Sequence, residues 1–445
     1  MNSSKKNIGV LGAGISGLSV AYELKNKGYK VTVYEKADEP GGVIRTKQED
    51  NWILELGPNT LLINSTPVSD FLDRLGLKDD CIEANPVAKK RFIIKNGEPV
   101  QIPLSAWDFL FSNLFSAKAK LKMLKEPFIG SANTEETIAD FFIRRLGKEP
   151  LDYGVNPFVS GVYAGDPEKL SIKHTFSSLH EMEQNHGSII KGMIASRKGS
   201  TIKRSLVSFK DGMQALPKKI AFELSDELFL NTEVSQIAKQ DSSWKVKTQK
   251  DTFRHDAIIS TIPAHTLSKV LDISETNTLT DINYAPMSVL HLGFHKESIK
   301  HPLDGFGMLI PKVENYNLLG CLFSSTLFEQ RAPKDHALLT CFMGGARNPE
   351  LAHKPKEELY KIALRELQQL LGTKGNPVFK HHTFWSHAIP QYELGYDFYL
   401  RTIEQIEKNN SGLFISGNFR NGVSVPDRIA KGIELAERIE SYMQS

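Results

Sequence analysis

The sequence has few of the features that mark secreted, metal-binding or nucleic-acid-binding proteins. Its 445 residues include three cysteines, Cys81, Cys321 and Cys341, which lie far apart and form no CxxC pair. Such thiols favour a reducing compartment and exclude a disulfide framework and a cysteine-based metal site, so no metal is expected. The formal net charge is +3 and charges of both signs are interspersed. A nucleic-acid partner is therefore not expected.

Long apolar runs are also missing. The first residues, MNSSKKN, lead into a strand-like run without the apolar core of a signal peptide. No apolar run reaches the roughly 20 residues of a membrane-spanning helix. We expect a cytoplasmic protein, for which peripheral contact with the inner face of the cell membrane stays open.

The most informative stretch is residues 7–35, NIGVLGAGISGLSVAYELKNKGYKVTVYE. Residues 8–11 are typical of a buried strand, apolar residues at helical spacing continue to Gly28, and residues 31–34 form a second strand-like run. The turn between strand and helix consists of Gly12, Ala13, Gly14, Ile15, Ser16 and Gly17.

This pattern predicts a βαβ unit that binds a dinucleotide. Gly12 suits the tight turn, Gly14 lets the backbone approach the phosphates, and Gly17 lets helix and strand pack closely. The helix start offers free N–H groups and the positive end of a dipole. Glu35, at the end of the second strand, would accept hydrogen bonds from a ribose hydroxyl. The alternative is a glycine turn in an ordinary α/β domain.

A second glycine pair follows in residues 38–46, DEPGGVIRT. Backbone amides at Gly42 could reach the phosphates, and Arg45 could add positive charge. An ordinary turn explains the same residues equally well.

The middle of the chain has a different character. Residues 90–103 predict two strands joined by an Asn96-Gly97 hairpin. Residues 104–129 combine Phe, Trp and Leu with four lysines, a pattern typical of a helical segment at a membrane surface. A core helix with a solvated lysine face is the alternative. Residues 156–167 contain two glycines, Gly161 and Gly165, and two prolines around aromatic residues. That composition favours a shaped, helix-poor loop of the kind that lines binding sites.

The C-terminal region has the same order of elements as the first unit. A strand at residues 413–416 leads into a glycine-containing turn, and a helix follows with Pro426 in its first turn. A nicotinamide enzyme has no need of this second helix start. A flavin enzyme can use it to stabilise negative charge on the reduced ring. The pair of helix starts therefore favours FAD over NAD.

With these motifs in place, the chain resembles the protoporphyrinogen oxidase family, oxygen-dependent FAD enzymes of haem synthesis in the monoamine oxidase and phytoene desaturase superfamily. The segments AGDP and GVSVPD point to this family in particular. The matching stretches run from end to end: GAGISGL (12–18), GGVIRT (41–46), LGPN (56–59), FVSGVYAGDPEKLS (158–171), GSIIKG (187–192), DGFGMLIP (304–311), AIPQY (388–392) and GNFRNGVSVPD (417–427).

The resemblance assigns further roles. Arg91 matches an arginine that pairs with a substrate propionate, although the run Lys89-Lys90-Arg91 could also be a solvated basic surface. Residues 105–190 resemble a membrane-binding domain, and relatives suggest a homodimer. Val234 would contact the adenine through its backbone. The residues expected near the flavin are Val43, Leu56, Gly57, Pro58, Asn59, Trp385, Val423, Ser424 and Val425, and those expected near the substrate are Arg91, Gly161 and Gly165.

The predicted fold class is α/β, α+β overall, with three parts. A Rossmann-like FAD-binding domain would comprise residues 1–85, 197–265 and 385–445. A mixed-sheet substrate domain would comprise residues 86–103 and 266–384, and a helical domain residues 104–196.

The implied reaction is the six-electron oxidation of protoporphyrinogen IX to protoporphyrin IX by molecular oxygen, with hydrogen peroxide formed. No side chain is assigned as an acid or base. Coproporphyrinogen III stays open as the substrate. More distant alternatives are a carotenoid desaturase, which the AGDP segment disfavours, a flavin amine oxidase and a non-catalytic porphyrin carrier. Many amine oxidases attach FAD through a cysteine near the C-terminal motif, and this chain has no cysteine beyond Cys341.

Overall fold

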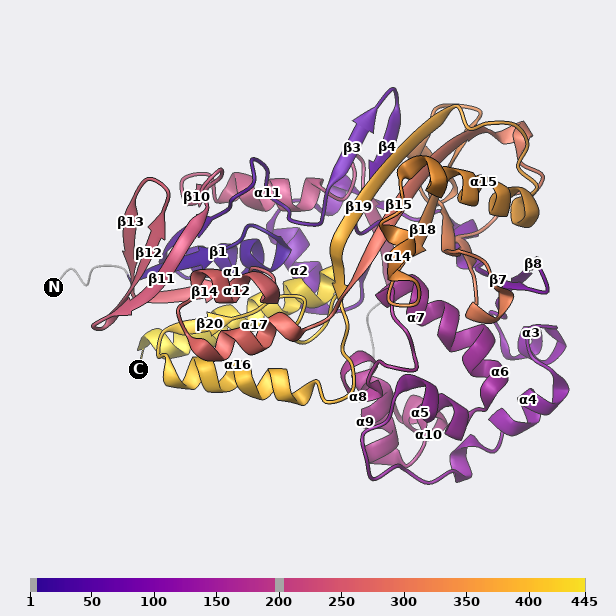
Figure 1. The fold of residues 1–445 in the computed structure, drawn as a ribbon, viewed down its shortest axis with the longest axis horizontal. Coiled ribbons are helices and arrows are strands. Elements are labelled where there is room, and N and C mark those ends of the chain that lie inside the picture. Colours follow the sequence, from indigo (N-terminus) through magenta and orange to yellow (C-terminus); the bar gives the residue numbers. More distant parts are fainter. Residues whose placement is uncertain (1–5, 197–203, 445) are drawn as a thin grey trace.

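A computed structural model describes residues 6–196 and 204–444, which form three packed groups of elements (Figure 1). A parallel sheet with its helices lies at one end of the molecule. A larger sheet and a group of helices lie at the other end. This arrangement confirms the predicted class, a mixed α/β protein. In the described residues no helix is long and apolar enough to cross a bilayer.

The first group is built on a five-stranded sheet in which every neighbouring pair is parallel. Consecutive residues of one strand, Ile258 and Ile259, belong to different apolar cores on the two faces of this sheet. The strands in order are β10 (Leu228–Phe229), β2 (Lys30–Tyr34), β1 (Asn7–Leu11), β14 (Ala257–Ser260) and β20 (Leu413–Ile415). One core is formed with α1 (Ile15–Asn26), α2 (Thr66–Arg74), α11 (Ala215–Glu223) and α17 (Val425–Gln444), and the other with α12 (Ala264–Val270) and α16 (Asp397–Asn409).

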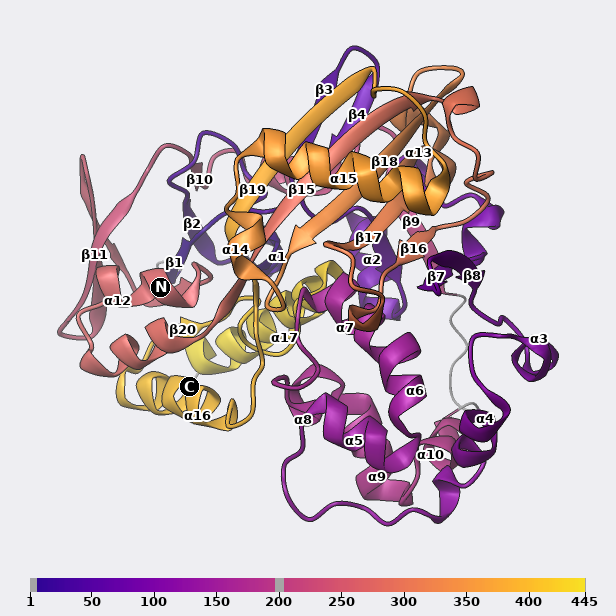
Figure 2. The same ribbon diagram turned by 45° about the vertical axis from the view of Figure 1, so that its right-hand side comes forward.

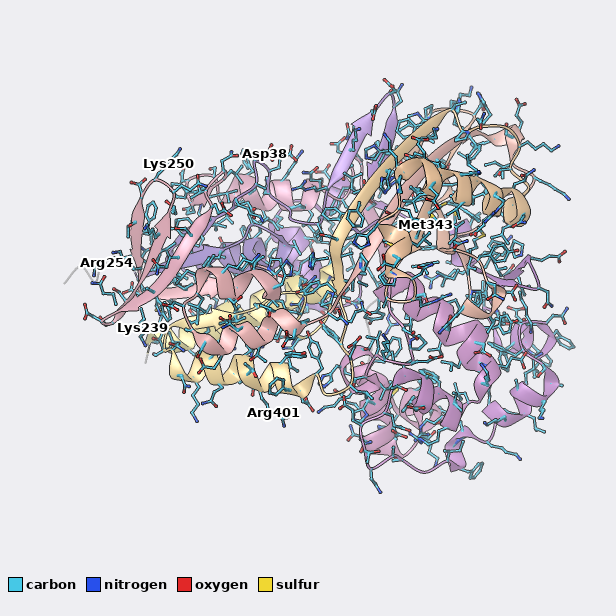
Figure 3. The ribbon with its side chains drawn as sticks, viewed as in Figure 1. Asp38, Lys239, Lys250, Arg254, Met343 and Arg401 are labelled. Atoms are coloured by element: carbon cyan, nitrogen blue, oxygen red, sulfur yellow. The ribbon has the colours of Figure 1, made fainter. Side chains whose placement is uncertain are left out.

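Three small sheets lie outside the two larger ones. Figure 3 shows Lys239, Lys250 and Arg254 on one of them, at the end of the molecule away from the larger sheet. Their strands are β3 (Thr46–Glu49) and β4 (Trp52–Glu55); β5 (Leu61–Ile63), β9 (Ser205–Phe209) and β6 (Cys81–Glu83); and β11 (Val234–Gln240), β12 (Ser243–Thr248) and β13 (Thr252–His255).

The second group is a seven-stranded sheet, antiparallel except for the β16–β7 pair. Its order is β19 (Phe379–Pro390), β15 (Tyr284–His295), β18 (His336–Gly344), β17 (Leu318–Phe323), β16 (Gly307–Leu309), β7 (Phe92–Lys95) and β8 (Glu98–Gln101). Helix α15 (Lys356–Leu371) lies across one face of this sheet (Figure 2), with α14 (Pro349–Ala352) beside it. On the opposite face, the Trp52 ring of β4 packs on Gly293, where a Cβ would lie 2.4 Å from the ring. Strand β19 runs without interruption through residue 385, the position at which the sequence predicts the boundary between the substrate domain and the FAD-binding domain.

The third group consists of helices around a small apolar core. Arg145 is fully buried here, between the carboxylates of Glu126 and Glu183. Glu126 also accepts hydrogen bonds from the Ser188 hydroxyl (2.5 Å) and the Ile189 amide (2.9 Å), which explains the GSIIKG motif. The helices are α3 (Ala106–Phe111), α4 (Ala117–Met123), α5 (Ile138–Arg145), α6 (Lys148–Pro150), α7 (Asn156–Tyr163), α8 (Ile172–Thr175), α9 (Ser177–His186) and α10 (Ile189–Ser196).

The prediction of a helix-poor loop at residues 156–167 is wrong for its first eight residues, which form α7. A π-helical turn, Leu151–Val155, leads into this helix, and Pro157 occupies its first turn, where a missing N–H is tolerated. Gly161 is inside the helix because it faces Leu309 of β16: a Cβ there would lie 2.4 Å from the leucine side chain. Ala164, in a left-handed conformation (φ 51°), ends the helix, so the loop begins only at that residue.

Candidate functional site

The turn after β1 is closed by backbone contacts. Gly12 has a positive φ of 93°, and its amide donates to the Tyr34 carbonyl oxygen at 2.8 Å. A Cβ at Gly17 would lie 2.0 Å from the Gly12 carbonyl oxygen, so no side chain fits there. Gly14, the residue before α1, is different, because a Cβ built on it would meet no atom within 4 Å. The open space at the amino end of α1 fits a phosphate group.

Glu35 lies at the carboxyl end of β2, beside this turn. Its carboxylate accepts hydrogen bonds from the backbone amides of Ala13 (2.7 Å) and Ala37 (2.9 Å). These bonds leave lone pairs on both oxygens for hydroxyl donors. The Thr232 amide donates to the Glu35 carbonyl oxygen at 2.8 Å, which brings Val234, at the start of β11, close to the same strand end.

The second glycine pair packs directly on the first turn. The Gly41 amide donates to the Ala13 carbonyl oxygen at 2.8 Å, and a Cβ at Gly42 would lie 3.3 Å from the Gly14 Cα. The Arg45 Nε donates to the Gly42 carbonyl oxygen at 3.1 Å. The two glycine-rich segments, which the sequence separates, therefore form one backbone surface.

The LGPN segment extends this surface. The Leu56 amide donates to the Arg45 carbonyl oxygen at 2.9 Å, and a Cβ at Gly57 would lie 2.0 Å from the Val43 carbonyl oxygen. The Trp385 indole N–H, from β19, donates to the Leu56 carbonyl oxygen at 2.7 Å. In the same segment, the Asn59 side-chain amide donates to the Gly57 carbonyl oxygen at 3.1 Å, across Pro58. These contacts join the seven-stranded sheet to the turn region.

The C-terminal motif forms the start of α17. The Ser424 hydroxyl accepts a hydrogen bond from the Asp427 amide, and the Asp427 carboxylate accepts one from the Ser424 amide, both at 3.3 Å. This is a capping box, which fixes where the helix begins. Because β1 and β20 are parallel, α1 and α17 both start at the carboxyl edge of their sheet, where ligands bind in open α/β sheets.

Sequence reasoning missed the buried support behind this surface. Glu55 is 4% exposed and pairs with Arg331 at 3.1 Å, and it accepts a hydrogen bond from the Met213 amide at 2.9 Å. Burial raises the pKa of Glu55 despite the arginine. Its backbone carbonyl oxygen is 3.1 Å from Nε2 of His291, whose pKa burial lowers to about 3. A glutamate in the apolar run WILELG was the available signal.

Two of the substrate residues expected from sequence, Arg91 and Gly161, lie along the seven-stranded sheet. Arg91 is exposed directly before β7, with its guanidinium 5.0 Å from the centre of the Phe306 ring. Gly161 packs on Leu309, and Gly165 lies against Leu170 and Gln391. Neighbouring side chains therefore pack closely on the backbone at both glycines.

Strand register places Arg91 and Trp385 on the same face of this sheet. Side chains directly opposite one another, or two residues apart on one strand, share a face. From β7 to β19, the residues directly opposite one another are Ile93, Leu309, Gly320, Phe342, Val289 and Thr383. Arg91 precedes Ile93 by two residues, and Trp385 follows Thr383 by two. Their strands are five spacings apart, about 24 Å at roughly 4.8 Å each.

Comparison with known proteins identifies the family. Residues 15–440 match the family model described as flavin containing amine oxidoreductase. The chain belongs to this family. Its curated relatives include protoporphyrinogen oxidase 2 of Arabidopsis thaliana, 37% identical over 99% of this chain and 95% of the relative, and coproporphyrinogen III oxidase of Bacillus subtilis (strain 168), 25% identical over 100% of both. These full-length matches place this flavoprotein among the protoporphyrinogen and coproporphyrinogen oxidases.

Solved structures share the fold of this flavoprotein. A crystal structure of an Exiguobacterium sp. 255-15 protein assigned as a protoporphyrinogen oxidase has a TM-score of 0.84 at 24% identity, over 99% of both chains. Putrescine oxidase bound to putrescine has a TM-score of 0.73 at 18% identity, over 98% of this chain and 99% of that one. A flavin bound through a dinucleotide-binding fold is FAD, and the open space at Gly14 and the half-buried carboxylate of Glu35 fit its phosphate and ribose groups.

The two glycines of the first turn should separate cofactor binding from folding. Gly14→Ala adds a methyl group in open space, so the apoprotein should keep its stability to within about 0.5 kcal/mol. The same methyl group should weaken FAD binding at least about tenfold, because it occupies the approach to the phosphates. Gly17→Ala, the matched variant, should destabilise the apoprotein itself. Urea unfolding of the apoprotein and FAD titration measure the two effects; equal FAD affinity in Gly14→Ala and the parent chain would contradict the assignment.

Proposed function

We propose that this flavoprotein oxidises protoporphyrinogen IX to protoporphyrin IX. The observation that carries the proposal is full-length identity of 37% to protoporphyrinogen oxidases of Arabidopsis thaliana and Nicotiana tabacum. The reaction consumes three molecules of oxygen and releases three of hydrogen peroxide for each porphyrinogen, which loses six electrons and six protons. Coproporphyrinogen III is the second candidate, because the Bacillus subtilis relative also matches over its whole length.

Bound FAD supplies the redox chemistry, accepting two electrons in each round and returning them to oxygen. The chain's own residues would bind and orient the partners. The β1–α1 turn and the 41–46 loop would hold the phosphates, with Arg45 adding charge and Glu35 binding the ribose. Val43, residues 56–59, Trp385 and residues 423–425 would surround the ring, and Val234 the adenine.

The substrate would lie across the seven-stranded sheet, between Trp385 and Arg91. Half-buried apolar side chains on that face, Leu309 and Phe342, suit the rings of a porphyrinogen. The Arg91 guanidinium suits a propionate, since arginine can bind a carboxylate through two hydrogen bonds. Orientation of the substrate carbon toward the flavin is then the protein's main contribution.

The three packed groups would divide these tasks. We assign FAD binding to the parallel-sheet group, substrate binding to the seven-stranded sheet and membrane contact to the helices of residues 104–196, in a protein of the cytoplasm that acts as a homodimer. An amine substrate is the weaker proposal: putrescine oxidase shares the fold at 18% identity, well below the 37% of the porphyrinogen oxidases.

Membrane contact would use a patch that we name the α3–α4 patch. Its side chains are largely exposed, with Trp107, Phe111 and Phe128 at 72%, 79% and 88%. Lys118 and Lys125 are exposed on the same segment. Apolar rings beside lysines suit the interface of a membrane that contains anionic lipids. The patch comprises Trp107, Leu110, Phe111, Leu121, Leu124 and Phe128.

Enzyme assays on both porphyrinogens test the reaction and the role of Arg91. Under air, the purified protein should produce porphyrin fluorescence faster from protoporphyrinogen IX than from coproporphyrinogen III. Arg91→Gln should raise KM about tenfold, because the charge-assisted pair of hydrogen bonds is replaced by at most one neutral bond at an exposed site. Lys90→Gln is the matched control, since that lysine pairs with Asp304 and should leave KM within about twofold. No enzyme-dependent fluorescence with either substrate would refute the reaction, and equal KM changes in both variants would refute the role of Arg91.

Vesicle sedimentation tests the α3–α4 patch. The parent chain should sediment with vesicles that contain anionic lipid, and less so at high salt, because lysine attraction is screened. The triple variant Trp107→Ser, Phe111→Ser, Phe128→Ser should remain in the supernatant. Phe222→Ser is the matched control, because Phe222 is 71% exposed on α11, outside the patch. Equal sedimentation of the triple variant and the parent chain would contradict membrane contact through this patch.

A further inference from the structure

The loop of residues 417–422, between β20 and α17, is held by two tyrosines. The Tyr392 hydroxyl donates a hydrogen bond to the Asn418 carbonyl oxygen and accepts one from the Gly422 amide at 3.1 Å. A single hydroxyl thus ties the two ends of the loop together. The Tyr396 hydroxyl donates to the Phe419 carbonyl oxygen at 2.9 Å, between those two positions.

An arginine on α17 also holds this loop. We name the three side chains, Tyr392, Tyr396 and Arg428, the clamp. Arg428 donates through its two terminal nitrogens to the carbonyl oxygens of Gly417 and Asn421. The three side chains are nearly inaccessible: Tyr392 is 4% exposed, Tyr396 2% and Arg428 3%. A tyrosine hydroxyl is a hydrogen-bond donor at neutral pH, because its ordinary pKa is about 10. Burial raises the pKa of both tyrosines further. The loop is therefore fixed by charged and neutral donors whose side chains are almost fully buried.

The clamp is itself anchored from the helical group. The Ser171 amide donates to the Tyr392 carbonyl oxygen at 2.8 Å, and the Leu394 amide donates to the Lys169 carbonyl oxygen at 3.2 Å. Lys173 of α8 pairs with Asp397, the first residue of α16. Tyr392 is held on both sides, by the segment after the AGDP turn and by the 417–422 loop, so its hydroxyl has little freedom to move.

We propose that Tyr392 is a positioning residue for the flavin ring. The 417–422 loop leads into Val423, Ser424 and the amino end of α17, and the Tyr392 hydroxyl fixes where that helix end lies. A helix amino end stabilises negative charge only within about its first turn. A loose loop would therefore weaken stabilisation of the charge that the reduced cofactor carries. This inference rests on the proposed placement of the ring beside residues 423–425.

The test is the two-electron midpoint potential of bound FAD in Tyr392→Phe, measured on the holoenzyme with a chemical reductant and a reference dye. Loss of the hydroxyl should make the potential about 30 mV more negative, a tenfold change in the equilibrium constant. With porphyrinogen under anaerobic conditions, the rate of flavin reduction should fall about tenfold while KM stays within about twofold. Tyr399→Phe, seven residues further along the chain on α16, is the matched control. No hydrogen bond joins the Tyr399 hydroxyl to the described part of the chain, so its potential should stay within about 5 mV of the parent value.

An unchanged potential in Tyr392→Phe overturns the proposal, including the case in which the melting temperature falls, because the tyrosine then only stabilises the fold. If Tyr392→Phe does not retain FAD, Tyr396→Phe decides, since it removes one bond to the same loop. A more negative potential supports the proposal and an unchanged one overturns it. The potential is measured without porphyrinogen, so a parent enzyme that leaves porphyrinogens unoxidised would refute the proposed reaction separately.

Discussion

The structure depends on backbone segments that approach one another too closely for any side chain to fit between them. A Cβ at Gly17 or at Gly57 would lie 2.0 Å from a carbonyl oxygen, that of Gly12 or of Val43. Gly42 packs less tightly on Gly14, with 3.3 Å between such a Cβ and the Gly14 Cα. These contacts turn three stretches that are separate in the sequence into one continuous backbone surface. Because that surface presents amides instead of side chains, it can follow the outline of a dinucleotide. Gly14 keeps the space beside it open.

The remaining elements position the side chains of the proposed substrate site relative to this surface. The Trp385 indole joins the edge of the seven-stranded sheet to Leu56, and the buried Glu55–Arg331 pair supports the same segment from behind. Strand register then places Arg91, directly before β7, on the face that carries Trp385, five strands away from it. The Trp385 contact thus joins the sheet of the proposed substrate site to the cofactor surface, and the clamp at Tyr392 links that surface to the helical group.

The elements that could be predicted from the sequence are those that depend on short-range patterns of residues. The first βαβ unit, the second helix start near Pro426 and the hairpin at Asn96-Gly97 all depend on neighbouring residues, and the structure confirms these elements. Helix α7 was missed because Pro157 and Gly161 usually interrupt helices, whereas here the preceding π-helical turn and the contact with Leu309 favour one. The pairing of Glu55 with Arg331 joins residues far apart in the chain, and no local pattern predicts it. The resemblance to a family identified Arg91 and Trp385 as candidate site residues. Only the strand register shows that they lie on the same face of the seven-stranded sheet.

Identification of the cofactor is the most direct test of the central claim, that the glycine-lined surface holds FAD without a covalent bond. Cys321 and Cys341 are buried against each other between β17 and β18, and Cys81 lies on β6, so none is beside residues 423–425. Acid denaturation of the purified protein, followed by chromatography of the supernatant, should release one FAD for each chain. Flavin that stays with the precipitate, or a mononucleotide in place of FAD, would contradict the account.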